Sequence, residues 1–219
     1  MIDEFNKIKE LFEEINNVID KKIKVYVIGG AALLCRDIKS ATKDIDLVVK
    51  SKSEFIRLQK SLEKLNFKPA LPDKTYSRMN LNQIFERKDF RIDLFEKEVC
   101  EKFFLSEKMI KRAEKITEYN FIKLFICSNE DIFLFKTMTE REGDLEDCIN
   151  IATTQTISWK IILNELKYQA KKSKKDVWIT WVGERFDILI EKGLDIPIMD
   201  EINKLRKDYY NKLENYLNK

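Results

Sequence analysis

The chain has 219 residues, enough for one α/β core with a smaller helical appendage. Lys and Arg total 41 against 38 Asp and Glu, and a net charge of +3 is too small to indicate a nucleic-acid-binding protein by itself. The absence of histidine excludes Ser-His-Asp and Cys-His catalysis and removes the usual zinc sites, so a general base must be a carboxylate, Lys, Tyr or Cys.

The cysteines and the apolar runs bear on the compartment. The four cysteines show no C-x-x-C spacing, and no signal-like run follows Met1, so we expect free thiols in a cytoplasmic protein. No stretch approaches the roughly 18 consecutive apolar residues of a membrane span, so we expect no membrane partner.

Hydrophobic periodicity predicts alternating helices and strands in the first part of the chain. The expected elements are an amphipathic helix over 1–20, a strand at 25–28, a helix after Gly29-Gly30, a strand at 45–49, a helix to about 65 capped by Ser51 or Ser53, a hairpin from Leu81 to Phe95, a helix at about 106–114 and a strand at 121–127.

A capping-box pattern at Ser128 then begins a region whose patterns are all helical. We therefore expect two domains, an α/β unit of four or five strands over residues 1–127 and a helical C-terminal domain over residues 128–219. No Pro/Gly-rich linker separates them, so the boundary is a change of structural class.

Two carboxylates stand two residues apart at the predicted strand 45–49. Side chains two apart on a strand share a face, so Asp44 and Asp46 project together, about 7 Å apart along the chain. Paired carboxylates of this kind hold Mg²⁺ ions that stabilise the attacking and leaving oxygens of a phosphoryl transfer. Asp93 is the candidate for a third ligand, because it is the acid flanked by buried-strand residues. A D-x-D pair taken alone is more often a solvated strand face.

The pair Gly29-Gly30 ends one predicted strand and begins a helix. Unpaired N–H groups and the helix dipole attract phosphate at such a point, and glycine lets the backbone approach closely. The alternative is a tight turn that requires positive φ. Neither G-x-G-x-x-G nor G-x-x-x-x-G-K-[ST] occurs, which excludes a dinucleotide-binding Rossmann site and a P-loop.

These motifs together carry a resemblance. Gly29-Gly30, then Ala41-Thr42-Lys43-Asp44-Ile45-Asp46-Leu47, then Asp93, resemble the DNA polymerase β-like nucleotidyltransferase superfamily, nearest to its AbiEii-like and related small members. The segment 136–147 is similar to a helix pair of those proteins. The resemblance spans about residues 25–152 and implies a mixed α/β (α+β) sheet with flanking helices, followed by a helical C-terminal domain that closes over the nucleotide.

The resemblance also implies site residues. Asp44, Asp46 and Asp93 would be catalytic and would ligate Mg²⁺ or Mn²⁺, and Asp93 would also orient or deprotonate the acceptor hydroxyl. The nucleoside triphosphate would be bound by Gly29, Gly30, Thr42, Lys43, Lys136 and Asp147, with Arg141 and Asp144 bracing the site. The alternative for the segment 136–147 is a capped, salt-bridged helix junction.

The chain departs from the superfamily pattern at two positions. The superfamily often has Gly-Ser where this chain has Gly29-Gly30, so a side-chain hydroxyl for the phosphate is missing. In many relatives an Arg stands two residues before the Thr, and Ser40 occupies that position here.

The C-terminal region combines Lys171, Lys172, Lys174 and Lys175 with Trp178 and Trp181. Such a mixture suits a phosphate backbone and stacked bases. The spacing of Trp178, Trp181, Phe186 and Leu189 favours core packing instead.

The sequence therefore predicts a metal-dependent enzyme that transfers NMP from NTP to an acceptor hydroxyl and releases pyrophosphate. The acceptor is open among RNA, especially a tRNA end modified by a toxin-like enzyme with an antitoxin partner, a small molecule and a protein. The alternatives are a nucleotide-binding protein without transfer activity and an interaction scaffold.

Overall fold

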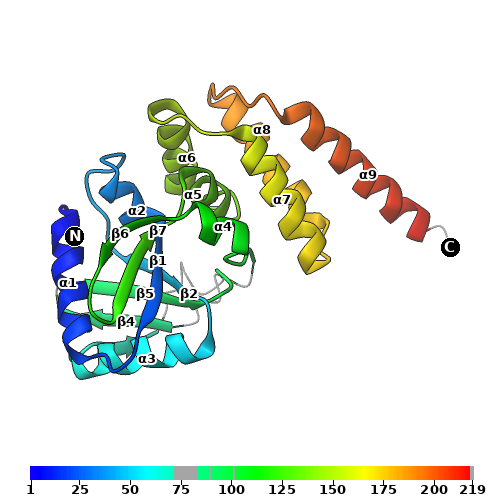
Figure 1. Ribbon diagram of the computed structural model, residues 1–219. Coiled ribbons are helices and arrows are strands. Elements are labelled where there is room, and N and C mark those ends of the chain that lie inside the picture. Colours follow the sequence, from blue (N-terminus) through cyan, green and yellow to red (C-terminus); the bar gives the residue numbers. More distant parts are fainter. Residues whose placement is uncertain (72–82, 89, 101, 218–219) are drawn as a thin grey trace. The chain divides into compact units, whose positions relative to one another are not determined.

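The computed structural model describes residues 1–71, 83–88, 90–100 and 102–217. Contacts within the chain define two compact units, Met1–Ser128 and Asn129–Lys219. The first unit holds the sheet and the second is helical (Figure 1). Across the described ranges, no helix has the length and apolar character needed to cross a membrane.

A mixed sheet forms the centre of the first unit, and its described part has seven strands in the order β3-β4-β5-β2-β1-β7-β6 (Figure 1). β1 runs antiparallel to β2 and parallel to β7, and β2 runs parallel to β5. The strands are β1 (Ile23–Ile28), β2 (Ile45–Val49), β3 (Lys68–Ala70), β4 (Gln83–Arg87), β5 (Phe90–Glu96), β6 (Glu114–Glu118) and β7 (Ile122–Ile126).

The helices of this unit pack against one another and against the central strands. They are α1 (Phe5–Val18), α2 (Gly29–Cys35), α3 (Lys52–Lys64) and α4 (Glu107–Arg112). The predicted amphipathic helix is confirmed, since α1 buries Ile8, Leu11, Phe12 and Ile15. The predicted cap at Ser51 is confirmed as well, because its hydroxyl accepts the Glu54 N–H at 3.3 Å.

Two edge strands were not predicted. The expected helix at 106–114 ends at Arg112, and the charged segment Glu114–Glu118 is β6. An edge strand that pairs on one side tolerates alternating charges, so it lacks the apolar pattern that reveals a strand. β3 has only three residues and contains Pro69, which suits an edge position. In the predicted hairpin, β4 and β5 are confirmed, while Leu81 lies outside the described residues.

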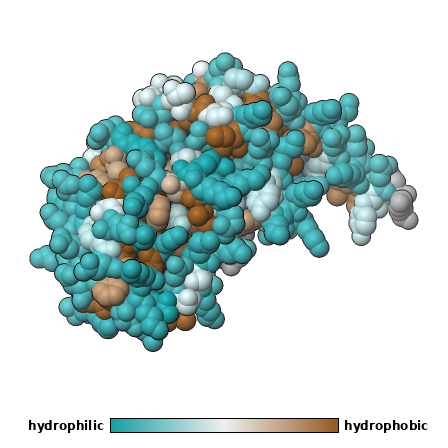
Figure 2. Space-filling model, viewed as in Figure 1, coloured by the Kyte–Doolittle hydropathy of each residue, from teal (hydrophilic) through white to brown (hydrophobic). Residues whose placement is uncertain are grey.

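The second unit confirms the predicted helical region. Its described helices are α5 (Asn129–Lys136), α6 (Glu142–Thr154), α7 (Trp159–Ser173), α8 (Val177–Glu191) and α9 (Met199–Leu217). Its core contains an aromatic cluster in which the Phe133 ring centroid lies 5.5 Å from that of Trp159 and 6.0 Å from that of Phe186. On the face shown in Figure 2 most of the surface is hydrophilic, with hydrophobic residues in small patches.

Candidate active site

The backbone at Gly29 and the carboxylate of Asp46 lie against each other. Gly29 follows the end of β1 with φ of +62°, and a Cβ placed on it would lie 2.0 Å from Asp46 Oδ2. The antiparallel register pairs Ile28 with Asp46, which brings the strand end to the acid. Glycine is therefore required twice here, by the left-handed backbone and by the close approach of the carboxylate.

The structure brings Asp46 and Asp93 onto adjacent strands. β2 and β5 are parallel, and Asp46 is the register partner of Asp93. Registered residues on neighbouring strands point to the same face, with their strands about 4.8 Å apart. Asp46 is half-buried, whereas Asp93 is only 3% exposed. The topology thus unites two carboxylates that lie 47 positions apart in the sequence, as 93 − 46 gives.

Arg91 engages both oxygens of Asp93. Its Nε donates to Oδ1 at 2.9 Å and its Nη2 donates to Oδ2 at 3.1 Å. The guanidinium is 20% exposed, so this pair is largely withdrawn from water. A bidentate pair of this kind is strong and directional. Arg91 was not predicted as a site residue, although its i, i+2 spacing on a strand places it on the same face as Asp93.

Thr42 fixes the loop that precedes β2. Thr42 forms a bridge with Ile2, and its hydroxyl donates to the Asp44 carbonyl oxygen at 3.1 Å. Thr42 is 5% exposed, and these two contacts hold the loop in place. The next residue, Lys43, is exposed. Asp44 itself is half-buried and lies one residue before β2.

The same threonine explains why position 30 is glycine. A Cβ on Gly30 would lie 2.5 Å from Thr42 Oγ1 and 3.2 Å from Thr42 Cβ. A serine here, as in many members of the superfamily that the sequence resembles, would have to displace the Thr42 side chain. Glycine at position 30, in place of serine, therefore leaves room for the Thr42 side chain in the loop before Asp44.

Lys136, at the end of α5, forms a buried ion-pair cluster with α6. Its Nζ lies 2.9 Å from Asp144 Oδ1 and 2.6 Å from Asp147 Oδ2, and all three side chains are less than 9% exposed. The Asp144 carboxylate also accepts from Arg141 Nε at 2.7 Å and from the Thr139 hydroxyl. These contacts form the salt-bridged helix junction that the sequence left as an alternative for this segment.

The charges in this cluster stabilise one another. Burial alone would lower the pKa of Lys136, but Asp144 and Asp147 beside it raise that pKa above its ordinary value. Burial would raise the pKa of Asp144, yet Lys136 and Arg141 together lower it to about 2. Nucleotide binding by Lys136 and Asp147 stays a prediction, and it would require exchanging these pairs for phosphate contacts.

Comparison with known families identifies the chain. Residues 6–191 match the family described as nucleotidyltransferase of unknown function, DUF6036. The chain belongs to this nucleotidyltransferase family. No curated protein sequence matches the chain.

The nucleotidyltransferase also has a structural relative, the antibiotic-resistance factor ANT(2'')-Ia, whose solution structure shows substrate-regulated conformation dynamics. The two chains share 12% identity, with a TM-score of 0.50 over 77% of this chain and 95% of that chain. At this identity the likeness shows the fold, and it confirms the predicted mixed sheet with a helical C-terminal region. The nearer AbiEii-like assignment stays a prediction.

The carboxylates of the nucleotidyltransferase suit a divalent metal in kind. Carboxylate oxygens are the ligands that Mg²⁺ prefers. Asp46 lies on β2 in register with Asp93 of β5, whereas Asp44 lies just before β2. Within the described residues, however, no three Asp, Glu or Cys side chains are arranged so that they could hold a metal ion. The structure brings Asp46 and Asp93 together but engages Asp93 with Arg91, so a three-carboxylate metal site requires that pair to open.

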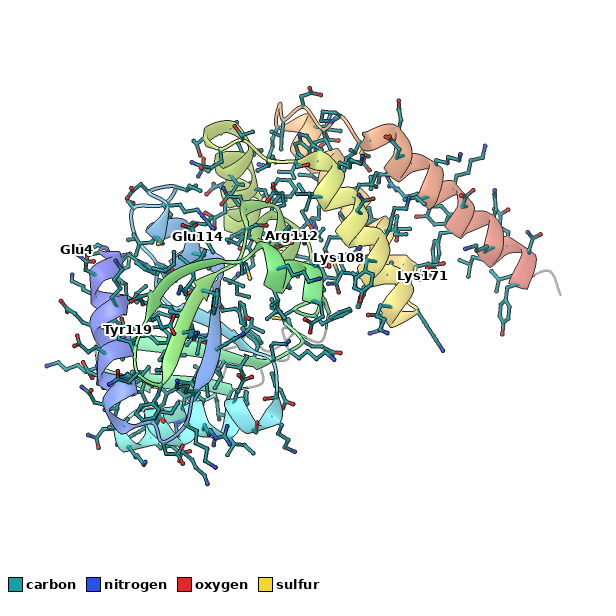
Figure 3. The ribbon with its side chains drawn as sticks, viewed as in Figure 1. Glu4, Lys108, Arg112, Glu114, Tyr119 and Lys171 are labelled. Atoms are coloured by element: carbon teal, nitrogen blue, oxygen red, sulfur yellow. The ribbon has the colours of Figure 1, made fainter. Side chains whose placement is uncertain are left out.

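The basic cluster of the helical unit does not offer Trp178 for stacking. Trp178 is 2% exposed, and Lys175 Nζ lies 5.1 Å from its ring centroid. The interpretation of Trp178 and Phe186 as core residues is confirmed. Trp181 differs, since its side chain is 42% exposed on α8. Lys171, on α7, is exposed (Figure 3).

Proposed function

We propose that this nucleotidyltransferase moves NMP from a nucleoside triphosphate to an acceptor hydroxyl and releases pyrophosphate. The observation that carries the proposal is the position of Asp46, whose carboxylate abuts the Gly29 backbone and is registered with Asp93. One carboxylate is thereby adjacent both to a glycine turn at the start of a helix and to a second acid. A solvated strand face would require neither relation.

The residues of this site have separate tasks in the proposal. Gly29 and Gly30 let the triphosphate approach the backbone, with the exposed Lys43 near the start of β2 as a counter-charge. Asp93 accepts the proton of the acceptor hydroxyl. At the same time the hydroxyl oxygen of the acceptor forms a bond to the α-phosphorus, and the bond between the α-phosphorus and the leaving pyrophosphate breaks. Arg91 compensates the Asp93 charge until the acceptor arrives, so one of its two contacts must open for that proton transfer.

Mg²⁺ or Mn²⁺ would be held by Asp44 and Asp46, with Asp93 joining once it is released by Arg91. Bound there, the metal supplies charge stabilisation of the attacking and leaving oxygens. Removal of a ligand charge should therefore remove transfer while sparing the core.

The decisive experiment supplies each nucleoside triphosphate labelled at the α-phosphate, with Mg²⁺ or Mn²⁺, to the wild type and to the Asp44→Asn and Asp46→Asn variants. We expect labelled product only from the wild type, with unfolding midpoints of the variants at or above its own, because carboxylate repulsion is relieved. Near wild-type transfer by a folded variant at all metal concentrations would refute the site.

The acceptor is assigned in the same assay. We propose RNA, in particular a tRNA end, as the first acceptor to test. An enzyme that modifies RNA in this way would have toxin-like activity and would require a neutralising antitoxin partner. Total RNA, small hydroxyl compounds and cellular protein are supplied in parallel, and the labelled fraction identifies the class. Metal-dependent nucleotide binding without label transfer in any arm would instead support the inactive nucleotide-binding protein.

A further inference from the structure

A cavity of about 400 Å³ lies in the first unit at the end of the sheet opposite the candidate active site. Its walls include Lys22 and Lys24 at the start of β1, and Tyr119, Phe121 and Lys123 of the β6–β7 hairpin. Lys24 precedes Gly29 by five positions along β1, about 17 Å of strand. The cavity, called here the lysine pocket, is therefore separate from the Gly29–Asp46 site. Its size suits a small organic molecule.

Positive charge is concentrated in the lysine pocket. Lys24 on β1 is the parallel register partner of Lys123 on β7. The two lysine side chains therefore extend from adjacent strands, whose backbones lie about 4.8 Å apart. Like charges placed opposite each other on a sheet destabilise it. Among the described residues no carboxylate pairs with the ammonium group of Lys22 or of Lys24.

The two acids of the lysine pocket are engaged by groups other than the ammonium groups of Lys22 and Lys24. Glu118 lies between Lys123 and Lys115, at 2.6 Å and 2.8 Å from their ammonium groups. Glu54 accepts the backbone N–H groups of Lys24 and Lys50, each at 3.2 Å, and thereby clips β1 to β2. Neither acid therefore forms an ion pair with Lys22 or Lys24, whose ammonium groups can bind an anionic ligand.

Two aromatic residues supply the apolar part of the wall. The Tyr119 hydroxyl donates to the Lys9 carbonyl oxygen at 2.8 Å, which holds this residue of the β6–β7 hairpin against α1 (Figure 3). Phe121 is 37% exposed although its neighbour Ile122 is fully buried. An exposed aromatic surface beside unpaired lysines favours a ligand that combines a planar apolar body with a negative charge.

We propose that the lysine pocket is a second binding site, for a small organic anion with an aromatic body. The anionic group lies against Lys24 and Lys22, and the ring lies against Phe121. Because the pocket and the candidate active site occupy opposite ends of β1, a ligand in one site does not sterically block a ligand in the other. The proposal does not depend on transfer activity.

The test uses the aromatic anion 8-anilino-1-naphthalenesulfonate and its uncharged analogue N-phenyl-1-naphthylamine as fluorescent probes of the intact chain. Lys24→Gln should weaken binding of the anion by roughly tenfold and leave the uncharged probe unaffected, since a charge-assisted contact is lost. Phe121→Ser should weaken both probes. Lys21→Gln, an identical charge change beside Lys22 but outside the lysine pocket, is the matched control and should change neither.

The Asp46→Asn variant separates this site from the active site. This variant should leave binding of the anion unchanged. Equal affinity of the anion for wild type and Lys24→Gln would overturn the proposal, and so would an equal effect of Lys21→Gln. A loss of transfer activity in Asp46→Asn with the probe still bound would test the proposed function alone.

Discussion

Gly29→Ala is expected to remove nucleotide transfer through two separable effects. The φ of +62° costs an L-residue about 1–2 kcal/mol. The new Cβ would lie 2.0 Å from Asp46 Oδ2, whereas ordinary contacts begin at 3.4 Å, so the carboxylate must retreat by about 1.4 Å (3.4 − 2.0). A misplacement of about 1 Å at a reacting group costs about 100-fold in rate. We expect a transfer rate reduced at least about 100-fold, with a stability loss of a few kcal/mol at most.

Gly193→Ala separates the two effects. Gly193 has φ of +93°, but no heavy atom lies within 4 Å of its added Cβ. This variant therefore carries backbone strain without a collision, and should lose stability while retaining transfer. In the double variant Gly29→Ala/Asp46→Ala the contact at 2.0 Å is removed and only the residue 46 Cβ remains close, at 3.3 Å, so its stability should exceed that of Gly29→Ala although it is inactive.

The assays are calorimetric unfolding and label transfer from an α-labelled nucleoside triphosphate. Transfer at the wild-type rate by a folded Gly29→Ala protein would refute the argument that Asp46 works at its observed position against Gly29. A strictly additive double variant would show that the loss of stability comes from the backbone alone.

Three further predictions concern the surroundings of the site. Gly30→Ser, which installs the residue common in the superfamily, should lower the unfolding temperature and not raise activity, because its Cβ would lie 2.5 Å from Thr42 Oγ1; scanning calorimetry and the transfer assay check this. Lys136→Met should destabilise the helical unit by about 3–5 kcal/mol, since it leaves two buried carboxylates without their ammonium partner. Urea unfolding followed by tryptophan fluorescence measures this, because all three tryptophans lie in that unit. The pKa of Asp144 is lowered from 3.8 to about 2 in the folded protein, which contributes about 2 kcal/mol to the free energy of unfolding above about pH 4. This contribution is lost as pH falls towards 2. The free energy of unfolding should therefore fall by about 2 kcal/mol more in wild type than in Asp144→Asn over that range.

The elements that position the site were predictable because their signals are local. An apolar run ending in two glycines marks the end of β1, and alternation marks β2 over residues 45–49. The edge strand β6 was not predicted because its charged residues face solvent, so its sequence lacks an apolar alternation. The order of the strands was not predictable either, because it depends on which strands pair across long separations in sequence.

The pair of Asp93 with Arg91 shows a different limit. Spacing on β5 was sufficient to place both side chains on one face, but opposite charges at i, i+2 are frequent on solvated strands and indicate no contact by themselves. What makes this pair significant is burial, since Asp93 is 3% exposed. Burial follows from the position of β5 between β4 and β2 and is a property of the whole sheet.

Lys136 illustrates why one pattern supports two roles. Asp144 and Asp147 stand three residues apart, so they face the same way from α6, and a lysine at the end of α5 meets them. The same arrangement that would direct an ammonium group at a phosphate therefore also builds a stable helix junction. Stability and nucleotide affinity distinguish the roles, because a purely structural lysine affects unfolding while a folded Lys136→Met protein keeps its KM for nucleoside triphosphate. A raised KM in the folded variant would instead place Lys136 in the nucleotide site, at the expense of its ion pairs with Asp144 and Asp147.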